Sequence, residues 1–131
     1  MVLYKLYQRV NPKAPDATRK YYAFAKTSGT AEIRYIATRI ARESTVSTVD
    51  TLAVLEALLD VIPDLLLEGK IVKLGEVGSF RLSLSSEGTE NLDDFNVSMI
   101  KRTNLLFRAG SEFKNRLKNV KFTKVSDTSN P

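Results

Sequence analysis

Residues 48–68 restrict the possible folds most, because they are apolar on two sides of a predicted helix. The first stripe, spaced by three or four residues, contains Leu52, Leu55, Leu59, Ile62 and Leu66. A second stripe contains Val54, Leu58, Val61 and Leu65. A helix that is apolar on two sides is usually covered on two sides. The segment therefore predicts a long helix that packs on its own chain along one side and on a second subunit along the other.

The third face of this helix is acidic. Four carboxylates follow one another at intervals of four residues: Glu56, Asp60, Asp64 and Glu68. A hard cation needs oxygens that converge from a loop or from several elements, and a single helical row does not converge. We therefore interpret the row as a solvated surface and predict no metal site there.

Short signals mark the ends of the predicted helices. Ser47 followed by Asp50 resembles a capping box and predicts the start of the long helix, and Gly69 predicts its end. Upstream, apolar residues at helical spacing predict a second helix over residues 31–43, with Thr30 as its N-cap.

Alternating apolar and polar residues predict strands on either side of the helices. Strands over 2–10 and 20–27, separated by a proline-containing turn, predict an N-terminal β-hairpin. After the long helix we expect strands over residues 71–77 and 80–85 and a polar connection over 85–96. A strand over 97–107 and a short basic helix over 111–118 should follow. The predicted fold class is α+β. Residues 127–131 are expected to fray.

Positive charge is concentrated near both ends of the chain, whose net charge is +5. Residues 1–42 contain nine Lys/Arg and two Asp/Glu, and residues 101–124 contain eight Lys/Arg and one Glu. Residues 43–100 contain three Lys/Arg and eleven Asp/Glu. A basic surface would attract a polyanion such as nucleic acid, and the alternative is a charged surface that serves solubility.

Composition argues against an enzyme. The chain has no histidine and no cysteine, which removes the commonest general base and all thiolate chemistry. Gly75 and Gly78 are too few and wrongly spaced for a phosphate-binding loop. No apolar run approaches the roughly 20 residues that a membrane span needs. We therefore expect a non-enzymatic protein with no cofactor, no metal, no small-molecule substrate and no membrane contact.

Two motifs resemble the HU/IHF histone-like DNA-binding family. Residues 72–80, Val-Lys-Leu-Gly-Glu-Val-Gly-Ser-Phe, resemble the segment with which that family enters its β-saddle. Residues 107–114, Phe-Arg-Ala-Gly-Ser-Glu-Phe-Lys, resemble the F-x-[AP]-G-x-x-[LF]-K return into its last helix. Residues 45–66 look like its dimer-forming helix, and the N-terminal strands resemble the HU-like subgroup of the Bacteroidetes lineage. The core resemblance covers about residues 30–118.

The resemblance implies a dimer base of two N-terminal helices under a β-saddle, with a β-arm, a short C-terminal helix and the added N-terminal β-hairpin. It implies an N-terminal extension over 1–28, an HU-like core over 29–118 and a C-terminal tail over 119–131. The expected partners are double-stranded DNA and a second copy of the chain, in the nucleoid of a bacterial cytoplasm. The expected dimer-interface residues are Leu52, Leu55, Leu59, Ile62, Leu66, Phe80 and Phe107.

The basic residues of the implied saddle and last helix are the candidate DNA contacts. They are Arg81, Lys101, Arg102, Arg108, Lys114, Arg116, Lys118 and Lys121. Arg81 lies opposite Phe80 and Leu82 in strand alternation, and Arg102 and Arg108 share one parity. In the saddle topology these side chains can point to one concave surface.

The expected arm departs from the family pattern. Family arms are basic and end in Arg-Asn-Pro, whose proline wedges between base pairs. Here the arm has no lysine or arginine over residues 86–96 and contains Glu87, Glu90, Asp93 and Asp94. Phosphates would repel this tip, which leaves open a dimeric structural or protein-interaction module with little DNA affinity. RNA binding is a second alternative to DNA binding.

The aromatic residues of the N-terminal strands have two possible roles. They are Tyr4, Tyr7, Tyr21, Tyr22 and Phe24. Aromatic side chains are common in strands, where they pack across a sheet, and the same rings can stack on nucleic-acid bases. The sequence favours sheet packing over base stacking.

Overall fold

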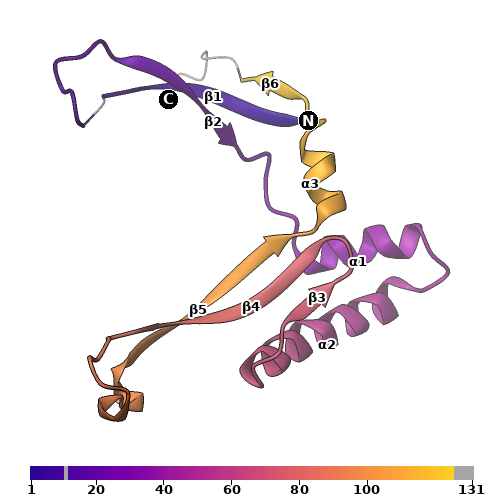
Figure 1. The fold of residues 1–131 in the computed structure, drawn as a ribbon. Helices are drawn as coiled ribbons and strands as arrows, with labels where there is room; N and C mark the ends of the chain where they lie inside the picture. Colours follow the sequence, from indigo (N-terminus) through magenta and orange to yellow (C-terminus); the bar gives the residue numbers. More distant parts are fainter. Residues whose placement is uncertain (11, 126–131) are drawn as a thin grey trace. The chain divides into compact units, whose positions relative to one another are not determined.

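The computed structural model describes residues 1–10 and 12–125, and the chain forms two compact units (Figure 1). The first unit comprises residues 1–31 and 117–131, and the second comprises residues 32–116. The end that we expect to fray, 127–131, lies outside the described residues. Among the helices that the structure describes, none combines the length and the apolar content needed to cross a bilayer.

The first unit is built on a three-stranded sheet with the order β2-β1-β6. Strand β1 (Val2–Arg9) pairs antiparallel with β2 (Lys20–Lys26), from Leu3 opposite Lys26 to Arg9 opposite Lys20. Strand β6 (Phe122–Lys124) pairs parallel with the start of β1. The sequence does not predict β6, because three residues are too few to show a period of two.

The second unit begins with two helices, α1 (Ile33–Arg42) and α2 (Thr48–Leu67), which pack on each other. The predicted cap of α1 is wrong: the N-cap is Glu32, two residues after Thr30, and its side chain makes no capping hydrogen bond. The predicted cap of α2 is confirmed, since the Asp50 amide donates to Ser47 Oγ at 3.1 Å.

The end of α2 is also as predicted. Gly69 has φ +84°, a left-handed conformation that a residue with a Cβ rarely adopts. Its amide donates to the Leu66 carbonyl at 2.9 Å, and the Lys70 amide donates to the Leu65 carbonyl at 3.1 Å. These two bonds form the Schellman motif, which satisfies carbonyls at the helix end and turns the chain into the sheet.

The sheet of the second unit has the order β3-β4-β5, with antiparallel pairing throughout. Its strands are β3 (Val72–Leu74), β4 (Gly78–Ser86) and β5 (Ile100–Ala109), followed by helix α3 (Ser111–Leu117). The predicted strand start at residue 97 is wrong, because Val97–Met99 forms a 3-10 turn, η2. The Ser98 amide donates to Asn96 Oδ1 at 3.0 Å, and this local bond replaces strand pairing.

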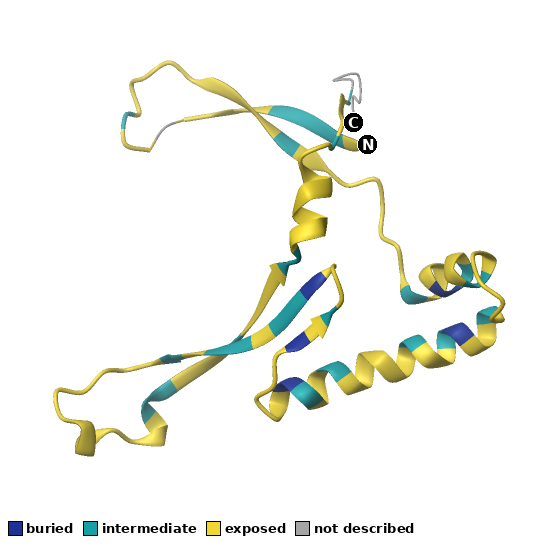
Figure 2. Cartoon of the chain, turned by 45° about the vertical axis from the view of Figure 1, so that its right-hand side comes forward, coloured by how far each residue is buried: buried dark blue, intermediate teal, exposed yellow. Residues whose placement is uncertain are grey.

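The core of the second unit is small. Among the described residues, those that are buried are Ala37, Thr51, Leu66 and Val72, together with Gly78 at the start of β4 (Figure 2). The α2 stripe that contains Leu66 is therefore the more covered one, although its Leu59 is 51% exposed. The second stripe is more open to solvent, with Val54, Leu58 and Val61 exposed by 67%, 38% and 47% and Leu65 partly covered.

A close backbone contact joins the β3–β4 turn to the start of α3. The Gly110 amide donates to the Val77 carbonyl at 3.0 Å. A Cβ added to Gly110 would collide with the Glu76 carbonyl oxygen, so only glycine fits this approach. The contact fixes where α3 begins relative to β3 and β4.

We predict that Gly110→Ala destabilises the protein by about 1–3 kcal/mol, because the backbone must shift to admit the methyl group. Gly88→Ala is the matched control, since a Cβ there meets no atom within 4 Å. Urea unfolding followed by circular dichroism at one protein concentration measures both variants. Equal midpoints for the two variants would contradict the proposed role of Gly110.

Candidate functional site

The register of the second sheet places most polar side chains on one face and most apolar side chains on the other. Directly opposed residues share a face, and alternate residues along a strand lie on opposite faces. On one face, which we call the basic sheet face, the paired positions are Lys73–Ser79–Arg108, Arg81–Leu106, Ser83–Asn104 and Ser85–Arg102. On the other face Phe80 lies opposite Phe107, with ring centroids 5.0 Å apart.

Three arginines predicted from the sequence lie together on the basic sheet face. Arg81, Arg102 and Arg108 are exposed, and none forms an ion pair within the part of the chain that the structure describes. Arg102 and Arg108 are six positions apart along β5, which corresponds to about 20 Å. Between them, Asn104 Nδ2 donates to Ser85 Oγ at 3.0 Å. The face therefore presents uncompensated cations over a length that several phosphates of a nucleic acid would occupy.

Lys73 is a member of this face that the sequence analysis missed. It lies in the same cross-strand row as Ser79 and Arg108. Its apolar neighbours Val72 and Leu74 place it on the polar side of a three-residue strand. That alternation could have identified Lys73, although so short a strand gives a weak signal.

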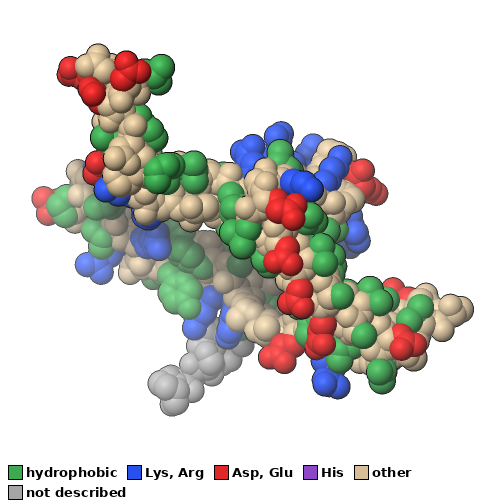
Figure 3. Space-filling model, turned by 90° about the horizontal axis from the view of Figure 1, so that it is seen from below, with side chains coloured by type: hydrophobic (Ala, Val, Ile, Leu, Met, Phe, Trp, Pro, Cys, Tyr) green, Lys and Arg blue, Asp and Glu red, His purple; other side chains and the backbone are tan. Residues whose placement is uncertain are grey.

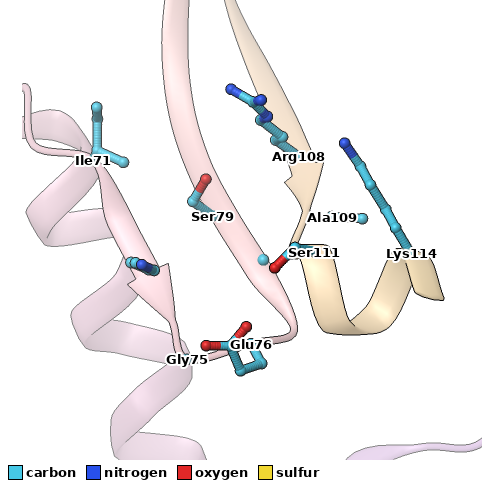
Figure 4. Close-up of a pocket in the computed structure, with 11 residues that line it drawn as sticks. Ile71, Gly75, Glu76, Ser79, Arg108, Ala109, Ser111 and Lys114 are labelled. Carbon is cyan, nitrogen blue, oxygen red and sulfur yellow. The ribbon is translucent and has the colours of Figure 1, made fainter. Parts of the chain in front are cut away.

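A pocket of about 430 Å³ lies where the basic sheet face meets α3. Its charged lining consists of Lys73, Arg108 and Lys114, with Glu76 as the one acidic member. Figure 4 shows the side chains of Arg108 and Lys114 extending to the same side, one from β5 and the other from α3. Three cations against one carboxylate favour an anion at this end of the face.

Lys101 does not belong to the basic sheet face. It has the opposite parity from Arg102 along β5. Its ammonium lies 3.7 Å from a carboxylate oxygen of Glu87 and donates to the Ser98 carbonyl at 3.2 Å. The structure thus separates Lys101 from the other predicted contacts and pairs it with an acidic residue of the arm.

The remaining predicted contacts lie elsewhere. Arg116 lines a separate pocket of about 150 Å³ together with the acidic residues Glu76 and Glu112. Lys118 and Lys121 follow α3, belong to the first unit and are exposed. Of the eight predicted residues, the structure gathers Arg81, Arg102, Arg108 and Lys114 around one face and its pocket.

Comparison with known proteins decides the family. A family described as "HU domain fused to wHTH, Ig, or Glycine-rich motif", HU-HIG, matches residues 1–124. The chain belongs to the HU-HIG family. The resemblance to HU-like DNA-binding proteins found in the sequence is thereby confirmed.

A solved structure supports the fold of this HU-HIG chain. It is a bacterial protein from Bacteroides vulgatus ATCC 8482, described as a candidate DNA-binding protein, with a TM-score of 0.63 and 11% sequence identity. The match covers 98% of this chain and 50% of that one, so the HU-HIG chain spans about half the length of the solved chain. No curated protein gives a significant sequence match.

The arm of the HU-HIG chain, residues 87–99, carries four carboxylates and two short 3-10 turns. Turn η1 spans Leu92–Asp94 and η2 spans Val97–Met99. Acidic side chains gather at the arm tip, at the upper left of Figure 3, and another acidic row follows α2. Leu92 and Val97 are 90% and 79% exposed, so the tip is both acidic and apolar.

The expected dimer-interface residues of this HU-HIG chain differ in exposure. Leu59 and Phe107 are half-exposed, at 51% and 50%. Leu52, Leu55, Ile62 and Phe80 are partly covered by their own chain. Leu66 is 6% exposed, which leaves it almost no surface to offer a partner.

Proposed function

We propose that this chain is a non-enzymatic, architectural protein that binds double-stranded DNA through phosphate contacts of the basic sheet face. The observation that carries the proposal is the alignment of Arg81, Arg102 and Arg108 on one face without partner carboxylates. Membership of the HU-HIG family supports it. Such a protein would act in the bacterial nucleoid.

The proposed binding tolerates many sequences, because arginines spread along a sheet face meet phosphates rather than a defined set of base edges. We do not extend the proposal to sharp DNA bending. The arm lacks the wedge proline, and its carboxylates would meet phosphates with like charge. No group of three or more potential metal ligands occurs in the described residues, and the proposal requires none.

A protein-interaction module is the second candidate function. The arm tip favours it, since Leu92 and Val97 are exposed beside four carboxylates. An exposed apolar tip with negative charge suits a basic protein surface better than a nucleic acid. Titration with duplex DNA separates these functions, because a DNA-binding protein must bind the duplex with an affinity that falls as salt rises, whereas an interaction module should bind it weakly or not at all. Competition with duplex RNA tests whether RNA is the preferred nucleic acid.

We also propose that the chain works as a homodimer. On α2, Val54, Leu58 and Val61 leave 67%, 38% and 47% of their surface exposed, and Phe107 of β5 is half-exposed. Burying an aliphatic or aromatic side chain is worth about 1.5–3 kcal/mol, so a few such side chains per subunit outweigh the cost of association.

We predict a sedimentation mass at micromolar concentration twice the 14.7 kDa of one chain. The double variant Val54→Asp with Leu58→Asp should yield the single-chain mass, or lose helix on dilution, because charge cannot be buried against a second copy. Val97→Asp is the matched control, since it adds charge at the exposed arm. A single-chain mass for the parent protein would contradict the dimer.

We predict that Arg81, Arg102 and Lys114 changed together to Ala weaken binding to random-sequence duplex DNA. Each lost phosphate contact should also reduce the slope of log affinity against log salt by about 0.9. Anisotropy titrations at three salt concentrations measure both effects. An unchanged triple variant would show that this face does not bind DNA.

Two neighbouring residues provide a finer control. Arg102→Ala should weaken binding, whereas Lys101→Ala should leave it within about two-fold, because surface changes without a contact have small effects. Arg102 is on the basic sheet face, and Lys101 has the opposite parity beside Glu87. Equal losses would indicate that net charge, and not the face, controls affinity.

We predict that Glu90→Gln, Asp93→Asn and Asp94→Asn together tighten duplex binding several-fold at about 0.1 M salt, where charges interact over about 10 Å. Glu87 is left intact to preserve its contact with Lys101. The matched control removes three charges from α2, with Glu56→Gln, Asp60→Asn and Asp64→Asn. Equal tightening in both variants, or none in either, would contradict a specific effect of the arm.

A further inference from the structure

The first unit carries the net positive charge of the chain. Residues 1–31 and 117–131 contain nine Lys/Arg and two Asp/Glu, whereas residues 32–116 contain eleven Lys/Arg and thirteen Asp/Glu. The more basic unit is therefore not the one that contains the basic sheet face. The net positive charge of the first unit favours a separate, negatively charged partner.

One face of the β2-β1-β6 sheet combines this charge with aromatic rings. We call it the aromatic face and define it by directly opposed pairs. These pairs are Leu3–Lys26, Lys5–Phe24, Tyr7–Tyr22 and Arg9–Lys20. Four cations thus lie around three rings. No carboxylate side chain accompanies them on these strands, since neither β1 nor β2 contains Asp or Glu.

The cations of the aromatic face hold the rings in place without carboxylate partners. The Arg9 guanidinium lies 4.7 Å from the Phe24 ring centroid, and the Lys5 ammonium lies 5.7 Å from that of Tyr7. Tyr7 and Phe24 meet edge to face at 5.6 Å. Lys5, Arg9, Lys20 and Lys26 form no ion pair within the described residues.

The rings remain accessible within their unit. Tyr7 and Tyr22 are exposed by 51% and 49%, and no residue of the three strands is buried (Figure 2). Sheet packing, which the sequence favoured, therefore leaves about half of Tyr7 and of Tyr22 open, whereas Phe24 is more covered. Exposed rings on a sheet face, bordered by Lys and Arg, are the combination that binds unpaired bases by stacking and the backbone by charge.

We propose that the aromatic face binds single-stranded DNA, with bases stacked on Tyr7 and Tyr22 and phosphates near Lys5, Arg9, Lys20 and Lys26. This site goes beyond the duplex binding proposed above and involves no residue of the basic sheet face. The chain then holds two DNA surfaces of different selectivity. The paired bases of a duplex do not offer their faces for stacking, so duplex DNA cannot use these rings.

The test uses the full chain and a fluorescein-labelled oligothymidylate of about ten nucleotides, a length within the range of one such binding surface. Tyr7→Ala with Tyr22→Ala should weaken binding by about ten-fold or more. Tyr7→Phe with Tyr22→Phe should bind like the parent, because the phenyl ring still stacks. Tyr21→Ala is the matched control: Tyr21 is 67% exposed in the same strand, on the opposite face.

Tyrosine emission gives a second readout, because the chain has no tryptophan. Oligothymidylate should quench the emission of the parent protein, and the Tyr7/Tyr22 alanine variant should lose most of that change. Far-ultraviolet circular dichroism of each variant checks that the fold is kept. Equal binding by the Tyr21 variant and the Tyr7/Tyr22 alanine variant would overturn the proposal, as would the absence of oligothymidylate binding by the parent.

A cross-comparison keeps the two DNA proposals separate. The variant with Arg81, Arg102 and Lys114 changed to Ala should keep its affinity for oligothymidylate, and the Tyr7/Tyr22 alanine variant should keep its affinity for duplex DNA. If the arginine and lysine variant loses duplex binding alone, the loss is assigned to the basic sheet face, and the stacking site stands. Loss of both activities in the arginine and lysine variant, or equal loss of duplex and single-strand binding in the tyrosine variant, would overturn a separate stacking site.

Discussion

The antiparallel register of β4 and β5 is the constraint on which the second unit depends. Phe80 opposite Phe107 sets the apolar face, and the same pairing places Arg81, Arg102 and Arg108 together on the other face. Because side chains alternate with a period of two, a shift of one residue in either strand would break up both sets. The close approach of Gly110 to Glu76 adds Lys114 to this arrangement by fixing the start of α3.

Electrostatics divides the chain into surfaces with different roles. The basic sheet face and the aromatic face present cations without carboxylate partners, whereas α2 and the arm present acidic rows. Charges closer than about 8 Å still interact at physiological salt. An acidic arm beside a basic face would therefore limit how closely DNA follows the hairpin. The same charge pattern therefore favours phosphate binding along the sheet and weak binding of DNA by the arm.

Several features of the fold could be read from local sequence. The Ser47 cap, the Gly69 stop and the alternation around Arg81 each depend on residues within one turn or one strand. Other features required contacts between distant residues. Strand β6 exists through its pairing with β1, and Lys73 joins Arg108 only through the register across β4. The pairing of Lys101 with Glu87 likewise depends on how the arm folds back.

The sequence by itself determined the order of the helices and the longer strands, the two apolar stripes of α2, the acidic arm and the family resemblance. It did so because periodicity, caps and charge runs are local properties of the chain. Tertiary structure decided which α2 stripe is the more covered, which cations share a face and that Tyr7 and Tyr22 stay half-exposed. These outcomes depend on register and packing between elements far apart in sequence, and a local pattern fixes the two faces of an element without fixing what each one meets.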